Sequence, residues 1–220
     1  MIKKISLMGL ELDDYSFPEA IKIIESFLAD TVLSVVLAVD MERLLRAGED
    51  PAVKEIISEA DYTVITDKAI PEAVPGSSGS ARVSELEERA FLTAFLNHMY
   101  REDRTFYLVG ASEQITNRMR DALQKSYSYI RIVGESAVHE DFSDAENCVN
   151  AINILVPDVI LSSLDTPQEE YFLKKYGTQI CARIWYGAGK DPLLKEGGFS
   201  LIRWLRRMRT REAFRARMHH

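Results

Sequence analysis

The chain has 220 residues, of which 46% are hydrophobic and 28% charged, and its formal net charge is −7. This composition is typical of a soluble protein with enough chain for one large domain, or for a domain with an appendage. It excludes a membrane-spanning helix, because no run of about 18 apolar residues exists, and the first residues lack the pattern of a signal peptide.

Short apolar runs alternate with amphipathic helical patterns along most of the chain. Strands are expected at 5–8, 33–39, 62–66, 105–109, 129–133, 159–164 and 181–186. Helices are expected at 18–29, around 44–57 with a break at 50–51, at 84–100, 113–125 and 143–155, and from 167 onward. Strands that alternate with helices build parallel βαβ units, so the pattern predicts an α/β fold with a mostly parallel, doubly wound sheet. Cys148 and Cys181 make no metal-binding pattern and are expected to be buried thiols rather than a disulfide.

The strand at 159–164 organises the prediction of a binding site. Its unbroken apolar run predicts burial on both faces, and Asp165, Thr166 and Pro167 then favour a helix start. Open α/β sheets bind ligands beyond the carboxyl ends of their strands. Gln168 would lie there, with an uncharged amide suited to a phosphate or sugar oxygen. The alternative is a well-capped turn that binds nothing.

Two earlier strands each end in an aspartate, Asp40 and Asp67. This pattern is expected if both strand tips line one crevice. Asp67 is the best candidate for a general base, because partial desolvation behind a buried strand would raise its pKa. The alternative is that Asp67 caps the following segment or pairs with Lys68.

Two glycine turns follow strands and are candidate phosphate sites. Gly110 precedes a helix, where backbone N–H groups can approach an anion. Gly187 and Gly189 precede Lys190 and Asp191, which suit a diphosphate and ribose hydroxyl groups. The alternative in both places is an ordinary turn with solvated charges. Because no GxGxxG motif occurs, an unrelated dinucleotide enzyme is the least favoured hypothesis. The Gly/Ser-rich stretch at 75–80 is interpreted as a connector, with a lid over a site as the alternative.

The C-terminal segment 199–220 is interpreted as a basic helical appendage to a core at 1–198. Residues 200–220 hold seven arginines and one acid, a charge of +6, and the remaining 20 basic and 33 acidic residues give −13. Leu201, Trp204, Leu205 and Met208 recur at helical spacing, which predicts a basic amphipathic helix. Such a helix suits a membrane surface or a polyanionic substrate, with nucleic acid as a further alternative. A helix packed on the core with solvated arginines is the simplest alternative.

The order of these motifs resembles the WecG/TagA/CpsF family of bacterial glycosyltransferases over almost the whole chain. The resemblance rests on Ala38-Val-Asp40, Asp67-Lys68, Arg82-Val83, Leu108-Val-Gly-Ala111, Gly134, Thr166-Pro-Gln-Glu169, Gly187-Ala-Gly189 and Arg203-Trp-Leu-Arg-Arg207. It implies a Rossmann-like core that transfers an N-acetylhexosamine-type sugar from a UDP donor to a polyprenyl-diphosphate-linked sugar, in bacterial cell-surface polysaccharide synthesis. No metal or other cofactor is implied.

The resemblance also implies roles for individual residues. Asp67 would be the base, and Gln168 would orient sugar or phosphate oxygens. The implied substrate-binding positions are Ala38, Asp40, Lys68, Arg82, Gly110, Gly134, Thr166, Gly187, Gly189, Lys190 and Asp191. The implied contacts to the acceptor diphosphate and the membrane are Arg203, Arg206, Arg207, Arg215 and Arg217. The expected partners are a UDP-sugar and a lipid-diphosphate-linked acceptor, not nucleic acid, and a homo-oligomer is left open. The expected location is cytoplasmic, at the inner face of the plasma membrane.

Several positions depart from the family pattern. Ala38 stands where the family has Thr, Asp40 where it has Asn, and Lys68 where it has Gly. Lys195-Glu-Gly-Gly198 replaces an Arg-Ala-Pro segment, and Arg203 and Arg211-Glu212 replace a Glu and a Glu-Pro of the family tail. These changes support an alternative hypothesis: a catalytically degenerate relative that binds a nucleotide-sugar or a partner transferase as a regulator or scaffold.

Overall fold

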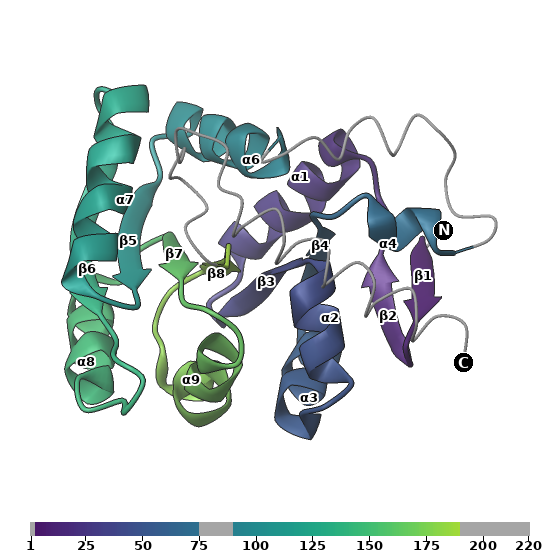
Figure 1. Cartoon of the computed structure of the whole chain (residues 1–220). Coiled ribbons are helices and arrows are strands. Elements are labelled where there is room, and N and C mark those ends of the chain that lie inside the picture. Colours follow the sequence, from purple (N-terminus) through teal and green to yellow (C-terminus); the bar gives the residue numbers. More distant parts are fainter. Residues whose placement is uncertain (1–2, 75–89, 190–220) are drawn as a thin grey trace, which may run out of the picture.

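The computed structural model describes residues 3–74 and 90–189, and in them six parallel strands form the central sheet (Figure 1). The strands are β3 (Ser34–Val39), β4 (Tyr62–Ile65), β5 (Thr105–Gly110), β6 (Arg131–Ala137), β7 (Val159–Ser163) and β8 (Ile184–Gly187). Their order across the sheet is β4-β3-β8-β7-β5-β6, and each neighbouring pair is parallel. The predicted α/β fold with a parallel, doubly wound sheet is therefore confirmed.

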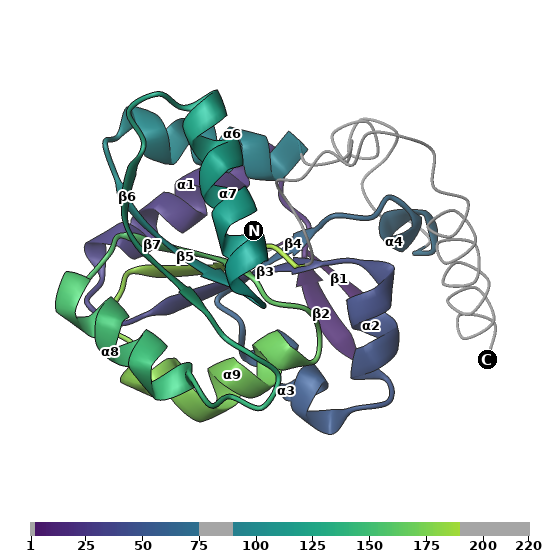
Figure 2. The same cartoon turned by 60° about the vertical axis from the view of Figure 1, so that its left-hand side comes forward.

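Helices cover both faces of this sheet (Figure 2). One face carries α1 (Phe17–Ser26), α6 (Ala90–Arg101) and α7 (Glu113–Ser126). The other carries α2 (Met41–Ala47), α3 (Pro51–Glu59), α8 (Ala145–Leu155) and α9 (Gln168–Tyr176). Shorter elements are α4 (Ala69–Glu72) and the 3-10 turns η1 (Phe27–Ala29) and η2 (Gly177–Gln179). No helix in the described ranges is long and apolar enough to cross a bilayer.

Alternating side chains of each strand supply the two cores. On β3, Leu37 and Val39 pack with α2, α3 and α9, whereas Val36 packs with α1 and α6. On β8, Trp185 lies in the first core and Tyr186 in the second. Successive side chains of a strand point to opposite faces, so a strand covered on both faces must be apolar throughout. This is why the unbroken apolar runs of the sequence identified the strands.

A separate antiparallel hairpin of β1 (Lys4–Leu7) and β2 (Leu10–Asp13) precedes the sheet, and β2 was not predicted. Its two-residue turn, Met8-Gly9, has positive φ angles of 52° and 72°. Hairpin turns of this type favour Asn-Gly or Asp-Gly, so Met-Gly gave little signal. Asp13 ties the hairpin to β4, because its Oδ2 accepts the Thr63 backbone N–H at 2.9 Å and the Thr63 hydroxyl at 3.0 Å.

Two predicted strands have clearly different bounds. β6 was expected at 129–133 but runs from Arg131 to Ala137, because its pairing with β5 extends to Gly110. β8 begins at Ile184 rather than at 181. Cys181 therefore lies in the preceding connection and is exposed, against the prediction, whereas Cys148 is buried and free as expected. The predicted connector at 75–80 and the predicted helical appendage at 199–220 lie outside the described residues.

Candidate active site

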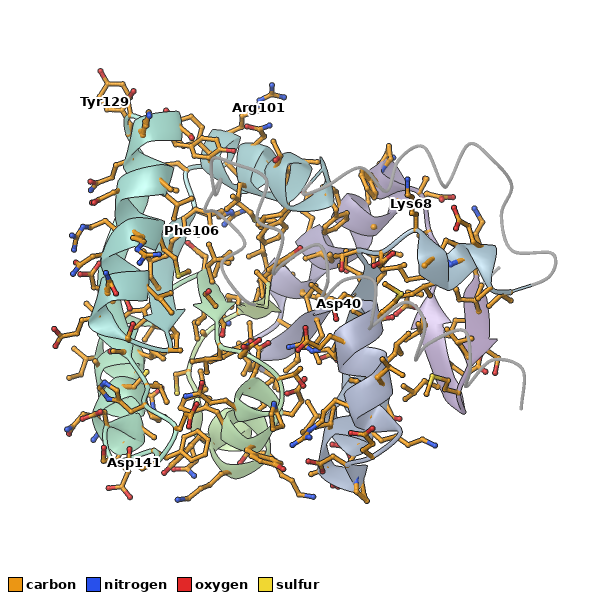
Figure 3. The ribbon with its side chains drawn as sticks, viewed as in Figure 1. Asp40, Lys68, Arg101, Phe106, Tyr129 and Asp141 are labelled. Carbon is orange, nitrogen blue, oxygen red and sulfur yellow. The ribbon has the colours of Figure 1, made fainter. Side chains whose placement is uncertain are left out.

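The carboxyl ends of β3 and β4 bring the two aspartates to neighbouring positions. β3 and β4 are paired up to Val39 and Ile65, and the Thr66 N–H donates to the Val39 carbonyl at 3.0 Å. Asp40 directly follows β3, and Asp67 follows Thr66. The strand tips therefore lie side by side, as the two aspartate endings predicted. Figure 3 shows Asp40 at the start of α2 and Lys68 at the start of α4.

Asp40 caps helix α2, because its Oδ1 accepts the Arg43 backbone N–H at 2.8 Å. The residue has a solvent-exposed surface, yet protein atoms surround most of its carboxyl group. This desolvation raises the pKa of Asp40 above its ordinary value, and the negative charges of Glu42 and Asp67 act in the same direction. The Arg43 N–H and guanidinium oppose the shift without cancelling it. At a given pH a larger fraction of Asp40 is therefore protonated than of an ordinary aspartate.

Asp67 is half-buried and uses one oxygen locally. Its Oδ1 accepts the Ala69 backbone N–H at 2.9 Å, which is the capping contact that the sequence left as an alternative. Within residues 3–74 and 90–189, Oδ2 has no hydrogen-bond partner. The exposed Lys68 begins α4. Asp67 is therefore oriented through Oδ1, and no described residue bonds to its Oδ2.

A buried charge cluster joins α2 to α9 behind these tips. Arg43 Nη2 lies 2.5 Å from Glu169 Oε2, and Arg43 Nε lies 2.8 Å from Glu170 Oε1. Arg43 Nη1 donates to the Ala38 carbonyl at 2.5 Å, and Trp185 Nε1 donates to Glu169 Oε1 at 3.0 Å. The three charged side chains are buried, with 3% of Arg43 and 0% of each glutamate exposed.

The cluster has two carboxylates for one guanidinium. Burial raises the pKa of Glu170 above its ordinary value, and the nearby charge of Glu169 adds to this, while Arg43 opposes it. Burial also disfavours the charged form of Arg43, but the two glutamates outweigh it and hold the pKa of Arg43 above its usual value. Arg43 thus stays a cation, fully engaged by protein groups. Sequence reasoning gave it no role, because nothing in one sequence links an arginine to glutamates so far along the chain.

Gln168 lies beside two neighbouring strands, β5 and β7, whose following helices pack on opposite faces of the sheet. β5 and β7 are paired, with Gly110 opposite Ser163, yet α7 covers one face of the sheet and α9 the other. Such a switch point is the usual ligand crevice of an open α/β sheet. Gln168 is buried, and its Nε2 donates to the Val138 carbonyl at 2.7 Å. This tether fixes the amide across the switch point.

The glycines expected near a ligand differ in their surroundings. A Cβ at Gly187 would lie 2.7 Å from both Glu169 carboxylate oxygens, so the charge cluster requires glycine there. Gly189 has a φ of 72° and open space around it. A Cβ at Gly110 would lie 2.6 Å from Thr116 Oγ1. Gly134 lies inside β6, where the Tyr107 ring would be 2.5 Å from a Cβ, which explains this glycine by packing.

The structure describes only some of the remaining predicted site residues. Thr166 precedes α9 and joins Pro167 through a cis peptide bond, and the Glu169 backbone N–H donates to the Asp165 carbonyl at 3.0 Å. Arg82, Lys190, Asp191, Arg203, Arg206, Arg207, Arg215 and Arg217 lie outside the described residues. In the part of the chain that the structure describes, no group of three or more His, Cys, Asp or Glu could hold a metal ion.

Comparison with known proteins agrees with this architecture. The model of the "Glycosyl transferase WecG/TagA/CpsF family" matches residues 5–190. Similar curated proteins include the N-acetylglucosaminyldiphosphoundecaprenol N-acetyl-beta-D-mannosaminyltransferases of Staphylococcus aureus strains MRSA252 and NCTC 8325 / PS 47. Each is 22% identical to this chain over 201 residues, which cover 84% of this chain and 73% of the relative. The chain belongs to the WecG/TagA/CpsF family of glycosyltransferases.

Proposed function

We propose that this protein transfers an N-acetylmannosamine-type sugar from a UDP donor to an N-acetylglucosamine carried on a polyprenyl diphosphate. The family and the names of the Staphylococcus relatives support this class of sugar and acceptor. The structural observation that carries the proposal is the meeting of Asp40 and Asp67 at the paired tips of β3 and β4.

Asp67 is proposed as the general base of a direct, inverting displacement. Such a reaction needs a carboxylate that can take the proton of the acceptor hydroxyl as that oxygen attacks the anomeric carbon. Asp67 is oriented through Oδ1 by the Ala69 N–H, and none of the described residues bonds to its Oδ2 at the strand tip. A base held in one orientation loses little freedom when the acceptor binds.

Asp40 is proposed to act as a neutral hydrogen-bond donor to the donor substrate. The family resemblance places an amide-bearing Asn at this position, and a charged carboxylate would repel a diphosphate. Crowding by protein atoms favours the protonated carboxyl group, whose O–H can donate where the Asn N–H would. In this way Asp40 remains compatible with an anionic ligand.

Release of UDP needs positive charge near the leaving diphosphate. Arg43 does not supply it, because the two glutamates and the Ala38 carbonyl already engage its guanidinium. Lys68 is exposed beside Asp67 and is the proposed cation among the described residues. Lys190 and the tail arginines are proposed as further contacts, the latter at the membrane surface where a lipid-linked acceptor resides.

Calorimetric titration with UDP, UDP-N-acetylglucosamine and UDP-N-acetylmannosamine tests the donor site. We expect micromolar binding, about −8 kcal/mol, for UDP and UDP-N-acetylmannosamine, with the same affinity in the presence of Mg²⁺ or of a chelator. Absence of heat at millimolar ligand would contradict a UDP-sugar site and would favour the scaffold alternative. NAD titrated in parallel serves as the control for non-specific nucleotide binding.

A further inference from the structure

The first turn of α9 places three polar side chains in succession inside the protein. Gln168 is 8% exposed, and Glu169 and Glu170 are completely buried. An apolar side chain can be held by packing from any direction, whereas a buried polar group needs a hydrogen-bond or ionic partner in a defined direction. The position of this turn therefore depends on the partners that its polar groups find.

Arg43 is the charged partner of this turn, and it also bonds to the tip of β3. Its Nε lies 2.8 Å from Glu170 Oε1, and its Nη2 lies 2.5 Å from Glu169 Oε2. Its Nη1 donates to the Ala38 carbonyl at 2.5 Å, and its backbone N–H donates to Asp40 Oδ1 at 2.8 Å. A guanidinium is planar and holds its N–H groups at fixed angles, so it sets the distances among its three acceptors.

The hydrogen bonds of the sheet do not set this spacing by themselves. β8 separates β3 from β7, and the parallel ladders end before either of the two proposed ligand residues. Asp40 follows β3, and Gln168 begins α9 after the turn that leaves β7. The contacts of Arg43 bridge this gap, because they run from the tip of β3 to the turn that carries Gln168.

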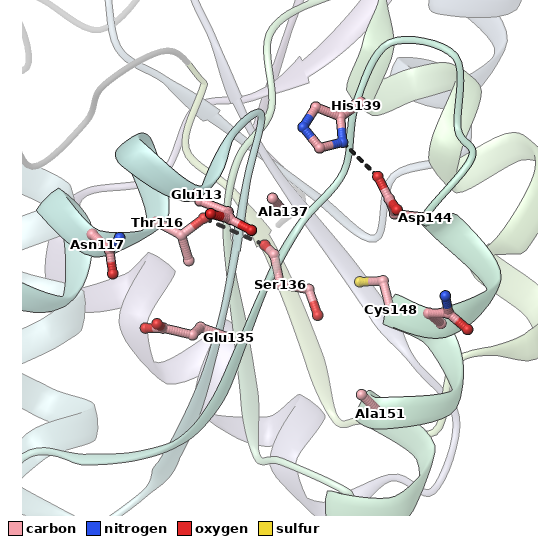
Figure 4. A pocket seen from close by; sticks show the side chains of 11 residues that line it. Glu113, Thr116, Asn117, Glu135, Ser136, Ala137, His139, Asp144, Cys148 and Ala151 are labelled. Carbon is pink, nitrogen blue, oxygen red and sulfur yellow. Dashed lines mark hydrogen bonds and ion pairs between the residues drawn. The ribbon is translucent and has the colours of Figure 1, made fainter.

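The amide of Gln168 is also tied to the connection between β6 and α8. Its Nε2 donates to the Val138 carbonyl at 2.7 Å, and the Val138 N–H donates to the Gly110 carbonyl at the end of β5 at 2.9 Å. Figure 4 shows the next part of this connection, where His139 Nδ1 lies 2.5 Å from Asp144 Oδ2 beside a hollow of about 570 Å³. Because the amide is anchored there, a displacement of the first turn of α9 would reorient the Gln168 side chain.

We propose that Arg43 is a positioning residue for the sugar transfer, and that its simultaneous bonds to the tip of β3 and to α9 fix the spacing between Asp40 and Gln168. This inference rests on the proposed function, in which Asp40 contacts the donor. It adds that the Gln168 amide orients a sugar or phosphate oxygen of the same substrate. Arg43 would act without touching the substrate, because protein groups engage its guanidinium. Misplacement of reacting groups by about 1 Å can lower a rate about 10²-fold.

Steady-state kinetics of sugar transfer by the full chain carrying Arg43→Lys test the proposal. Lysine keeps the positive charge, but a single ammonium group does not reproduce the planar fork of the guanidinium. We expect kcat to fall about 10–10²-fold, with a smaller change in KM for UDP-N-acetylmannosamine, because misalignment acts on the reaction step more than on binding.

Leu123→Ala is the matched control for a loss of stability. Leu123 is buried in the core on the other face of the sheet, so its truncation destabilises the protein without touching the cluster. At a temperature where circular dichroism shows both variants folded, Leu123→Ala should keep the wild-type kcat. Equal losses of kcat in the two variants, or an unchanged kcat in Arg43→Lys, would overturn the proposal.

NMR of the Gln168 side-chain amide tests the geometry without substrate. Its resonances, assigned by their loss in Gln168→Glu, should move in Arg43→Lys and stay in place in Leu123→Ala. Amide resonances that do not move in Arg43→Lys would overturn the proposal whatever the activity. Resonances that move, in a protein whose wild type transfers no sugar, would contradict the proposed function but support the positioning of Gln168 by Arg43.

Glu169→Gln is a second variant, which keeps the test decisive if lysine at position 43 prevents folding. It removes the surplus negative charge of the cluster and keeps the shape of the side chain. Arg43 and Trp185 bond to different oxygens of Glu169, and glutamine offers only one oxygen, so one of these bonds is lost. A lower kcat and displaced Gln168 resonances are expected, and wild-type values of both would overturn the proposal.

Discussion

Arg43 Nη2 and Glu169 Oε2 lie 2.5 Å apart, although the residues are 126 positions apart in the sequence. Arg43 belongs to the first turn of α2 after β3, and Glu169 to the first turn of α9 after β7. β8 lies between these strands and contributes Trp185 to the same cluster. The buried cluster therefore joins α2, α9 and β8, which follow or form three neighbouring strands of the sheet.

Removing this arginine should strongly destabilise the protein. Arg43→Met leaves two glutamates buried without a cation, and breaking a buried pair from one side costs about 3–5 kcal/mol. Urea denaturation measures the loss in the free energy of unfolding. Lys174→Ala is the matched control, because its pair with Glu55 is about half exposed and should contribute less than about 1 kcal/mol. Equal losses for the two variants would contradict the role of the buried cluster.

The glycine in β8 should tolerate no side chain. Gly187→Ala would place a Cβ 2.7 Å from the Glu169 oxygens and from Leu37 Cδ2, all in buried surroundings. Overpacking of this kind costs about 1–3 kcal/mol, and it would also push Glu169 away from Arg43. Thermal unfolding should therefore show a clear decrease in Tm.

Gly177→Ala is the control for that substitution. Gly177 has helical dihedral angles, and a Cβ there would meet Leu173 only at 4.0 Å. Its expected effect is neutral or stabilising by up to about 1 kcal/mol, because alanine restricts the unfolded chain. A larger loss of stability at Gly177 than at Gly187 would refute the packing argument.

The raised pKa of Asp40 predicts a pH dependence of donor binding. Protonated Asp40 persists above the ordinary carboxyl range, so UDP affinity should fall as pH rises through the folded-state pKa and the carboxylate begins to repel the diphosphate. Because the pKa of Asp40 is higher in the folded than in the unfolded chain, its protonation also adds to the free energy of unfolding. This contribution is greatest at acid pH and is lost as pH rises through the folded-state pKa. Asp40→Asn should lack both dependences and should still cap α2, because Asn is an equally good N-cap.

Calorimetry of the wild type and of Asp40→Asn at several pH values measures this effect. The two proteins should bind UDP with similar affinity at acid pH and diverge toward neutral pH, with the Asn variant binding more tightly. Parallel pH profiles for the two proteins would show that Asp40 holds no proton that matters for the ligand.

Local pattern was sufficient to predict the parallel sheet and the adjacency of Asp40 and Asp67. The unbroken apolar runs indicated strands that are buried on both faces. The aspartate after each run marked the carboxyl end of that strand. The sequence did not predict the burial of Glu169 and Glu170, because charged residues in a first helical turn are usually solvated. Only tertiary contact with Arg43 and Trp185 explains why they are inside. Gly134 resembled a ligand turn, but its reason is the Tyr107 ring on the neighbouring strand.

The most direct test of the proposed function is transfer of sugar from UDP-N-acetylmannosamine to a short-chain prenyl-diphosphate N-acetylglucosamine. We expect turnover by the wild type, and a kcat about 10²–10⁴-fold lower for Asp67→Asn with UDP binding retained, which is the usual contribution of a general base. Asp121→Asn, at an exposed residue on α7, is the control and should behave as wild type. Unchanged turnover in Asp67→Asn, or no transfer by the wild type, would contradict the account.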